Sequence, residues 1–469
     1  MPQRRLAGTP LDFGAIRTEL GVPGEFSSAA LRDAQQAVAD LRLPELDRTD
    51  IEFVTVDPPG SKDLDQAVHI AAEGDGFLVS YAIADVASFV DPGSALDLEV
   101  RKRGETFYFP DARVPLHPVA LCEGAASLLP DQVTPAVLWQ IHLDGKGNFL
   151  RWDVQRARVR SRAQWDYPSL QAACESGTAP DAVTLLPRVG LLRQQLARQR
   201  HAIELNLAEQ EVVCGDDGAW TLILRAPLPI EDANAEISLL TGMVAAQLML
   251  SGGIGIVRTL PPPDPRAVKE LRAIAPSLGV DWPAGAAPGD VIAGLDVANS
   301  KHAAFIEHAA SLLRGAAYAA FDGQAPSQPL HSGIGSAYAH VTAPLRRLVD
   351  RFASEVCLSL HSGQDVPAWV RQALPELPTF MSEADGLAHR ADRAVVDATE
   401  AFLLSDRVGQ RFPATVLNSD VKGCTIALDE PAVRARCEND GTVPEAGSRV
   451  TAELLAADVE KRSVRFVIR

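Results

Sequence analysis

The stretch TVDPPGSKDLDQAVHI, residues 55–70, places an acidic loop between two segments that resemble buried β-strands. Asp57, Asp63 and Asp65 all lie in this loop or at its edges. Carboxylates held close together repel one another, which raises their pKa values or unfolds the loop unless a cation neutralises them. Carboxylate oxygens are hard ligands, so the stretch predicts a Mg²⁺ or Mn²⁺ site suited to phosphate chemistry. A solvated acidic turn is the alternative, and the flanking strand favours the metal site.

Composition restricts the class of protein. The chain has 469 residues and 46% hydrophobic content, enough for a large core and more than one domain. The formal charge is 44 − 61 = −17, which argues against a protein that coats nucleic acid but leaves room for a local basic channel. As a hypothesis, basic residues line an internal channel and the outer surface is acidic.

The cysteines and the N-terminus indicate where the protein works. The six cysteines lie far apart without a CxxC pair, so the sequence predicts neither a zinc site nor a disulfide framework. The N-terminus lacks an apolar h-region, and we expect no run to reach the roughly 18 apolar residues of a membrane span. We expect a cytoplasmic protein with no membrane association.

The pattern along the chain predicts three regions. Residues 1–46 contain two short helices, with Ser27 or Ser28 as an N-cap, which form either a helix-turn-helix appendage or a pair that packs on the next domain. Residues 47–404 mix strands and helices and predict an α/β (mixed α+β) domain. Residues 405–469 contain five short strands, which predict an OB-fold barrel, the alternative being a β appendage without a ligand.

Two basic features are candidates for nucleic-acid contacts. Residues 136–164 predict a hairpin that turns at DGKGN, and its second strand has an arginine at every other position from 156 to 162. RKR at 101–103 lies on a predicted charged helix. Both features could contact an RNA backbone, and solvated faces are the equally weighted alternative.

A second candidate site lies in GSAYAHVTAPLRRLVDR, residues 335–351. The segment predicts an apolar helix with Thr342 as N-cap and Arg346, Arg347 and Arg351 near its start. A helix N-terminus with guanidinium groups binds anions, although an amphipathic surface helix has the same pattern. Together with the acidic loop, it predicts a phosphodiester-cleaving site in which metal activates water and arginine stabilises the phosphate.

At these residues a family resemblance appears. DPPGSKDLDQA, YAIADVASFVDPGSALDLEVRKRGETFYFPD, VPLHP, ASLLPDQ and YAHVTAPLRRLVD occur in this order. In these motifs the chain resembles the RNB catalytic domain of the ribonuclease II family of exoribonucleases. The resemblance implies processive, metal-dependent, hydrolytic 3′ to 5′ degradation of single-stranded RNA to nucleoside 5′-monophosphates by a two-metal mechanism. It implies Mg²⁺, with Mn²⁺ as a substitute, and no organic cofactor.

The resemblance also implies roles for individual residues. Asp57, Asp63 and Asp65 match metal-binding acids, and Asp65 is expected to be the most critical. Gln66 stands where many members have a fourth Asp, so the second metal is expected to be held more weakly. Arg346 matches the arginine that contacts the reacting phosphate, with Arg347 beside it.

Further positions match residues that contact RNA in the family. Tyr108 and Tyr167 match tyrosines that stack on RNA bases, one near the channel mouth and one near the 3′ end. Leu205 appears in place of an aromatic clamp, which predicts a weaker hold on the terminal bases. Glu236 and Asp392 match acidic positions that hydrogen-bond ribose hydroxyls or neighbouring side chains.

The flanks lead to the functional expectation. Family members usually have two cold-shock barrels before the catalytic domain, whereas only about 46 helical residues precede it here, so a wider entrance is expected. We expect a monomeric 3′ to 5′ exoribonuclease that acts on single-stranded RNA. A catalytically weakened RNA-binding regulator, marked by Gln66, is the alternative. A metal-dependent phosphodiesterase for small nucleotides is a third and weaker one.

Overall fold

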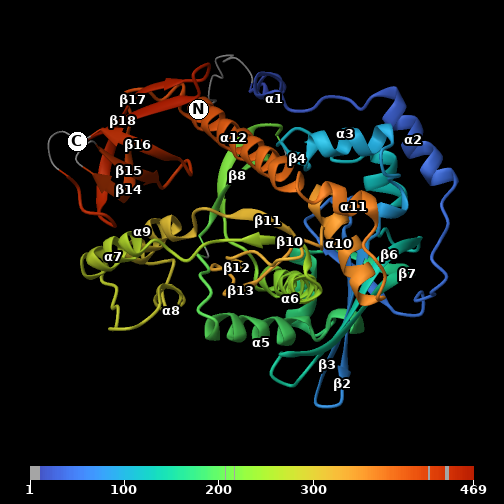
Figure 1. Ribbon diagram of the computed structural model, residues 1–469. Coiled ribbons are helices and arrows are strands. Elements are labelled where there is room, and N and C mark those ends of the chain that lie inside the picture. The colour runs from blue at the N-terminus through green and yellow to red at the C-terminus, as the bar shows by residue number, and fades with distance from the viewer. Residues whose placement is uncertain (1–10, 206, 216, 421–422, 439–442) are drawn as a thin grey trace.

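The computed structural model describes residues 11–469 apart from 206, 216, 421–422 and 439–442. Two closed β-barrels lie on opposite sides of the molecule, and the long helix α12 (Leu377–Leu404) runs from the first region to the second (Figure 1). The mixed α and β composition predicted from the sequence is confirmed.

The first barrel contains the acidic loop. Its strands are β1 (Phe53–Asp57), β2 (Gln66–Glu73), β3 (Gly76–Ala84), β6 (Val133–Leu143) and β7 (Phe149–Asp166). β1 pairs with β2 in the antiparallel and with β7 in the parallel sense, which closes the barrel. The predicted hairpin at 136–164 is confirmed as β6 and β7. Trp139 and Tyr81 are fully buried in this core, so the barrel is filled and gives its strand ends a rigid frame.

Helices surround the first barrel. They are α3 (Ala95–Arg103), α4 (Tyr167–Ser176), α5 (Leu186–Gln199), α6 (Pro229–Gly252), α10 (Leu348–His361) and α11 (Ala368–Ala373). α5 and α6 approach closely at Gly190, where an added Cβ would lie 2.5 Å from Ala233 Cβ. By length and composition α6 could cross a membrane, which the sequence expectation overlooked. Its apolar window is 56% buried inside the fold, the position of a core helix.

Four two-stranded sheets and three helices connect these parts. The sheets pair β4 (Phe107–Tyr108) with β5 (Arg113–Val114), β8 (Glu209–Cys214) with β9 (Trp220–Arg225), β10 (Ile254–Thr259) with β11 (Ala317–Asp322), and β12 (Leu330–His331) with β13 (Ser336–Ala337). The helices are α7 (Pro265–Ile274), α8 (Pro288–Ile292) and α9 (Ser300–Ala309). They have a small apolar core of their own, and α9 lies against the second barrel (Figure 1).

The second barrel is formed by the C-terminal residues. Its strands are β14 (Arg411–Asp420), β15 (Gly423–Leu428), β16 (Arg434–Glu438), β17 (Arg449–Asp458) and β18 (Ser463–Ile468), in the order β14-β15-β16-β18-β17. Alternating burial along these strands gives the barrel its own apolar core, which includes Leu404 at the end of α12. The predicted five-stranded barrel of OB type is confirmed.

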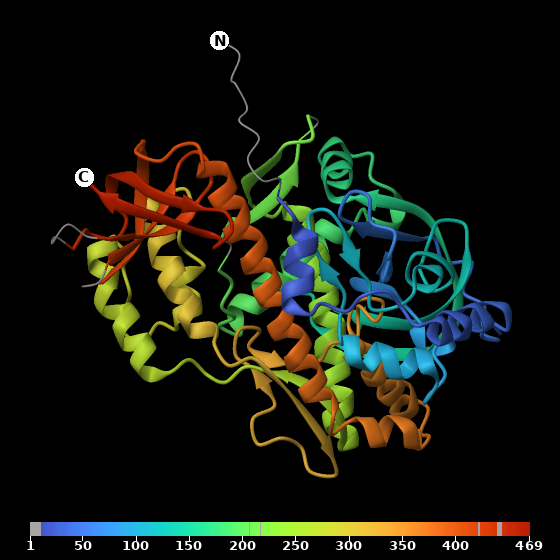
Figure 2. The same cartoon turned by 90° about the horizontal axis from the view of Figure 1, so that it is seen from above.

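The two N-terminal helices pack on different parts of the molecule. α1 (Phe13–Leu20) lies beside α12, as Figure 2 shows, and α2 (Ser28–Ala39) lies on α3. Ser27 is the N-cap of α2 and also donates to Glu99 of α3, while the Arg103 guanidinium lies 3.6 Å from the Phe26 ring centroid. Each helix therefore belongs to a core shared with later residues, which agrees with the alternative of a helix pair that packs on the next domain. The domain boundary at residue 46 stays a prediction.

Candidate active site

The β1–β2 hairpin brings the ends of the acidic loop together. Val54 of β1 pairs with Val68 of β2, so Asp57, the last residue of β1, and Asp65, which directly precedes β2, lie at the two ends of the connecting loop. Leu64, between two of the acids, is fully buried, and its backbone N–H donates to Ser127 Oγ at 3.0 Å. Burial of Leu64 fixes the loop, and its neighbours Asp63 and Asp65 line the adjacent cavity.

The parallel neighbour of β1 brings in a tyrosine. Asp57 at the end of β1 pairs in register with Asp166 at the end of β7, and Tyr167 follows as the first residue of α4. Asp166 accepts a hydrogen bond from the Ser169 backbone N–H and so caps α4. The Tyr167 hydroxyl accepts a hydrogen bond from Asn234 Nδ2 of α6 at 3.5 Å. Two parallel strand ends thus place an acid and an aromatic side by side.

One cavity of about 820 Å³ collects most of the predicted site residues. Its lining includes all three acids of the loop, Gln66, both predicted tyrosines and one of the predicted arginines: Asp57, Asp63, Asp65, Gln66, Tyr108, Tyr167 and Arg346. Tyr108 lies on the short strand β4 and is 51% exposed, which leaves a ring face open to a stacking base.

The segment that carries Arg346 is a loop, which corrects the predicted helix start. α10 begins at Leu348 with Arg347 as its N-cap, six residues after Thr342. Ala343 precedes a proline, which disfavours helical backbone, and its N–H donates to the Asp350 carboxylate at 2.7 Å. The Arg346 carbonyl accepts from Thr106 N–H at 3.0 Å, so the loop is tied to the chain leading into β4.

The three arginines of this segment have different partners. Arg346 Nε lies 3.7 Å from Asp65 Oδ2, and its side chain is 47% exposed toward the cavity. Arg347 donates from Nε and Nη2 to the Asp350 carboxylate. Arg351 is buried and donates to Asp97 at 2.6 Å. Of the three, Arg346 is the one placed to meet a phosphate, and the predicted RNA contact of Arg347 stays a prediction.

Burial and mutual repulsion perturb the acids. Burial raises the pKa of Asp57 to about 7, with Arg346 lowering it and Asp63 raising it further. Burial also raises the pKa of Asp65 well above its usual range, although Arg346 and the Leu345 N–H, which donates to Asp65 Oδ1 at 2.7 Å, oppose the shift. A divalent cation would offset the cost of charging both groups.

The donor set fits a hard divalent cation without forming a finished site. Within the described ranges, no three acidic, histidine or cysteine side chains converge as a complete ligand group. Asp57 Oδ2 is buried and has no hydrogen-bond partner among the described residues, which leaves this oxygen available as a metal ligand. Gln66 Nε2 donates to the Thr342 carbonyl, so its Oε1 is the atom left for a metal. Its metal role stays a prediction.

Family models cover most of the chain. The RNB domain matches residues 46–356, and the RNase II-type exonuclease C-terminal S1 domain matches residues 410–469. The chain belongs to the RNB family. The resemblance stated from the sequence motifs is therefore confirmed, and the S1 match agrees with the second barrel.

Individual relatives of this RNB protein are distant. Ribonuclease R of Aquifex aeolicus is 26% identical over 448 residues, which cover 88% of this chain and 62% of the relative. Exoribonuclease 2 of Serratia proteamaculans is 27% identical over 412 residues, which cover 83% of this chain and 62% of the relative. The apo form of Mycoplasma genitalium RNase R superimposes with a TM-score of 0.85 at 20% identity, over 97% of this chain and 77% of that one. The chain spans about 62% of the length of the curated relatives.

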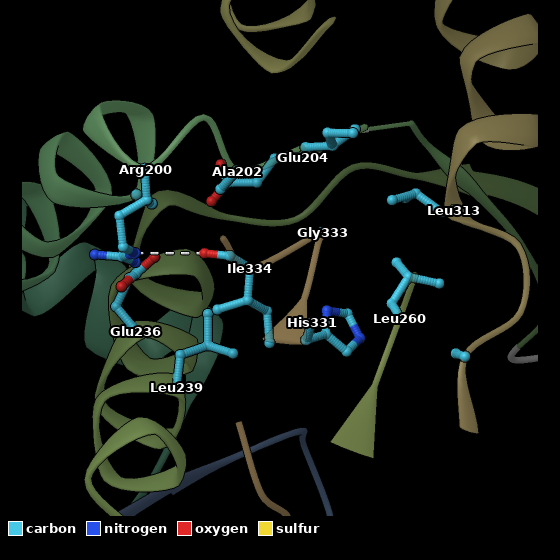
Figure 3. Close-up of a pocket in the computed structure, with 13 residues that line it drawn as sticks. Arg200, Ala202, Glu204, Glu236, Leu239, Leu260, Leu313, His331, Gly333 and Ile334 are labelled. Carbon is cyan, nitrogen blue, oxygen red and sulfur yellow. Dashed lines mark hydrogen bonds between the residues drawn. The ribbon is translucent and has the colours of Figure 1, made fainter. Parts of the chain in front are cut away.

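Four predicted RNA contacts lie outside the lining of the cavity that contains Asp57, Asp63 and Asp65, called the RNB cavity from here on: Leu205, Glu236, Arg347 and Asp392. Leu205 and Asp392 line a neighbouring cavity of about 1720 Å³, which shares Tyr108 and Pro59 with the first. Glu236 lies in a third cavity of about 250 Å³, beside Arg200 and across from His331 (Figure 3). Burial raises the pKa of Glu236 to about 7, while Arg193 lowers it. The RNA roles of these residues stay predictions.

The hypothesis of a basic channel is wrong for the large cavity. Its described lining has six acids and two arginines: Glu209, Glu211, Glu307, Asp392, Asp397, Glu400, Arg393 and Arg434. Two of the four arginines in the row on β7 also have acidic partners. Arg156 pairs with Asp85 and Glu355, and Arg158 pairs with Asp47. These carboxylates come from other elements, since Asp85 follows β3, Glu355 lies on α10 and Asp47 precedes β1.

Sequence reasoning missed one charged pair at the site. Arg113 and Glu123 both line the RNB cavity, and Arg113 forms ion pairs with Asp63 and with Glu123. Their positions between the FYFPD and ASLLPDQ motifs give no local signal of this contact, because it depends on how β5 lies against the acidic loop.

Proposed function

We propose that this RNB protein is a hydrolytic 3′ to 5′ exoribonuclease that degrades single-stranded RNA to nucleoside 5′-monophosphates by a two-metal mechanism, with Mg²⁺ or Mn²⁺. The observation that carries the proposal is the single cavity that holds three aspartates, Arg346 and two tyrosines. The names of the relatives, Ribonuclease R and Exoribonuclease 2, support RNA as the substrate.

The aspartates would hold the metal. Asp57, Asp63 and Asp65 are the residues for this role, and a bound divalent cation supplies Lewis acidity and a more acidic water. The Leu345 N–H fixes one oxygen of Asp65, so the direction of its other oxygen is set by the backbone rather than by a free rotamer. This restraint keeps the acid in place while the substrate changes.

Arg346 would stabilise the phosphate. Its guanidinium lies beside Asp65 and is open to the cavity, so it can meet the charge that develops on a phosphodiester under attack. Because the backbone of its loop is tied to Thr106 and Gly104, this positive charge is positioned before the substrate arrives.

The two tyrosines would orient the RNA. Tyr167 lies on the Asp57 side of the cavity and Tyr108 at its border with the larger cavity. Aromatic rings accept any base by stacking, which suits hydrolysis without sequence preference.

The test uses 5′-labelled single-stranded RNA with Mg²⁺, resolved on a gel. Wild type should shorten the RNA progressively from its 3′ end, and Asp65→Asn should abolish shortening. Asp75→Asn is the matched control, because Asp75 is exposed just beyond the other end of β2. If wild-type protein binds the RNA but leaves it intact, the proposal is wrong and the chain is the RNA-binding regulator. Hydrolysis of dinucleotides alone would replace it by the small-nucleotide phosphodiesterase.

A further inference from the structure

Arg113 lies at the border of the catalytic cavity, beside a residue that the proposed function already uses. Strands β4 and β5 form a short hairpin in which Tyr108 and Arg113 are direct cross-strand partners. Adjacent side chains on one face of such a pair lie close enough to contact the same ligand. Both residues line the cavity that contains the acidic loop.

The Arg113 guanidinium is shared between two carboxylates. Nη1 forms an ion pair with Asp63 Oδ1, and Nη2 forms one with Glu123 Oε1. The Arg113 side chain is 20% exposed and that of Asp63 is 10% exposed, so water screens this contact less than a surface pair. Asp63 also lies 3.4 Å from the Tyr108 hydroxyl. One of the proposed metal ligands thus already has a positive partner.

We propose that Arg113 competes with the divalent cation for Asp63, and that Glu123 retains the displaced guanidinium in the cavity, where it binds a substrate phosphate. The phosphate part rests on the proposed function. The competition part concerns the cation alone and can be measured without RNA.

Electrostatics and geometry support this competition. A cation that binds Asp63 takes over the lone pairs that Arg113 uses and repels its positive charge. Since Glu123 lies on the other side of the guanidinium, the displaced group keeps one ionic partner. The freed Nη1 edge then faces a cavity suited to phosphate, which a guanidinium binds through two parallel N–H groups. Arg346, paired with Asp65, supplies the second positive group.

The first measurement is Mn²⁺ binding by isothermal titration calorimetry, on the full chain without RNA. Arg113→Gln should bind Mn²⁺ about tenfold more tightly, the equivalent of about 1.4 kcal/mol. Glu123→Gln should bind it more weakly, because Arg113 then has Asp63 as its remaining carboxylate. The double variant should resemble Arg113→Gln. Changes of opposite sign at two partners of one ion pair do not arise from general destabilisation.

A matched control comes from the same hairpin. Arg17 pairs with Asp111, which lies between β4 and β5, so Arg17→Gln removes a comparable ion pair outside the cavity lining and should leave Mn²⁺ binding unchanged. If Arg113→Gln binds Mn²⁺ as wild type does, or more weakly, then Arg113 only orients Asp63 and the proposal is overturned. Arg113→Lys, which keeps the charge, serves if Arg113→Gln fails to fold; it should bind Mn²⁺ as wild type does, and tighter or weaker binding would overturn the proposal.

The second measurement separates the two parts. With RNA and saturating Mn²⁺, Arg113→Gln should raise KM about tenfold and change kcat less, because a phosphate contact is lost. An unchanged KM would overturn the phosphate part. If wild type hydrolyses no RNA, the proposed function fails, whereas the opposite Mn²⁺ effects of Arg113→Gln and Glu123→Gln would still support competition for Asp63.

Discussion

Asp57 is expected to destabilise the metal-free protein increasingly as the pH rises from 5 to 8, and Asp57→Asn should remove this contribution. Asp57 is 9% exposed, and its Oδ2 has no hydrogen-bond partner among the described residues. Burial raises its pKa to about 7 from 3.8, with Arg346 opposing the shift and Asp63 adding to it.

The sign follows from proton binding. Because the pKa is higher in the folded state, the folded protein binds more protons than the unfolded chain between about pH 4 and pH 7. This group's contribution to stability is complete below pH 3.8 and is lost as the pH rises through 7. The shift of about 3 pKa units corresponds to at most about 4 kcal/mol. Asparagine has no charge to bury, so at pH 8 the variant should be more stable by up to this amount.

The assay is urea unfolding with EDTA, followed by tryptophan fluorescence at pH 5 and pH 8. Three of the six tryptophans, Trp139, Trp152 and Trp165, lie in the first barrel and report on it. Asp47→Asn is the control, because hydrogen bonds from Thr49 lower the pKa of exposed Asp47 to about 2, so its charge is constant over this range. An Asp57→Asn variant with the same change in unfolding free energy between pH 5 and pH 8 as wild type would refute the reasoning.

Three further outcomes are expected. Leu64→Ala removes the fully buried anchor of the acidic loop and should cost about 2–5 kcal/mol in urea unfolding while weakening Mn²⁺ binding in calorimetry. Arg346→Lys keeps the charge but loses the guanidinium fork, so kcat should fall at least about tenfold in steady-state assays, with a smaller change in KM. Neutralising the acidic cavity with Asp392→Asn and Glu211→Gln should tighten RNA binding at low salt and have less effect at high salt, as filter binding would show. Unchanged values in these assays would contradict the roles given to the three features.

The parts of the site that are local in sequence could be predicted. Asp57 and Asp65 lie at the two ends of one hairpin connection, so any antiparallel pairing of the flanking strands brings them together. The position of Tyr167 beside Asp57 could not be predicted from a local pattern, because it depends on β7 running parallel to β1. Arg346 lies some 280 residues from Asp65, and the chemistry of acidic and basic side chains, together with the family resemblance, rather than the spacing, predicted that the two share a site.

The wrong predictions have a common cause. The helix start at Thr342 and the basic channel were inferred from residue types without knowledge of their partners. The segment that ends at Arg347 stays a loop because its backbone groups bond to Asp65, Asp350 and Thr106, all distant in sequence except Asp350. Likewise, the row of arginines on β7 suggested an RNA surface, yet Asp85 and Glu355 neutralise Arg156 from two other elements.

The three aspartates differ in how far the protein already compensates their charge. Asp65 has a backbone N–H and Arg346, and Asp63 has Arg113 and the Tyr108 hydroxyl nearby. Asp57 is buried with one oxygen that lacks a partner among the described residues. A cation therefore gains most from Asp57, where no protein group has to be displaced, and less from Asp63, where Arg113 must leave. Since a ligand that binds the folded state alone stabilises it, Mn²⁺ should stabilise wild type more at pH 8 than at pH 5, and this difference should be smaller in Asp57→Asn.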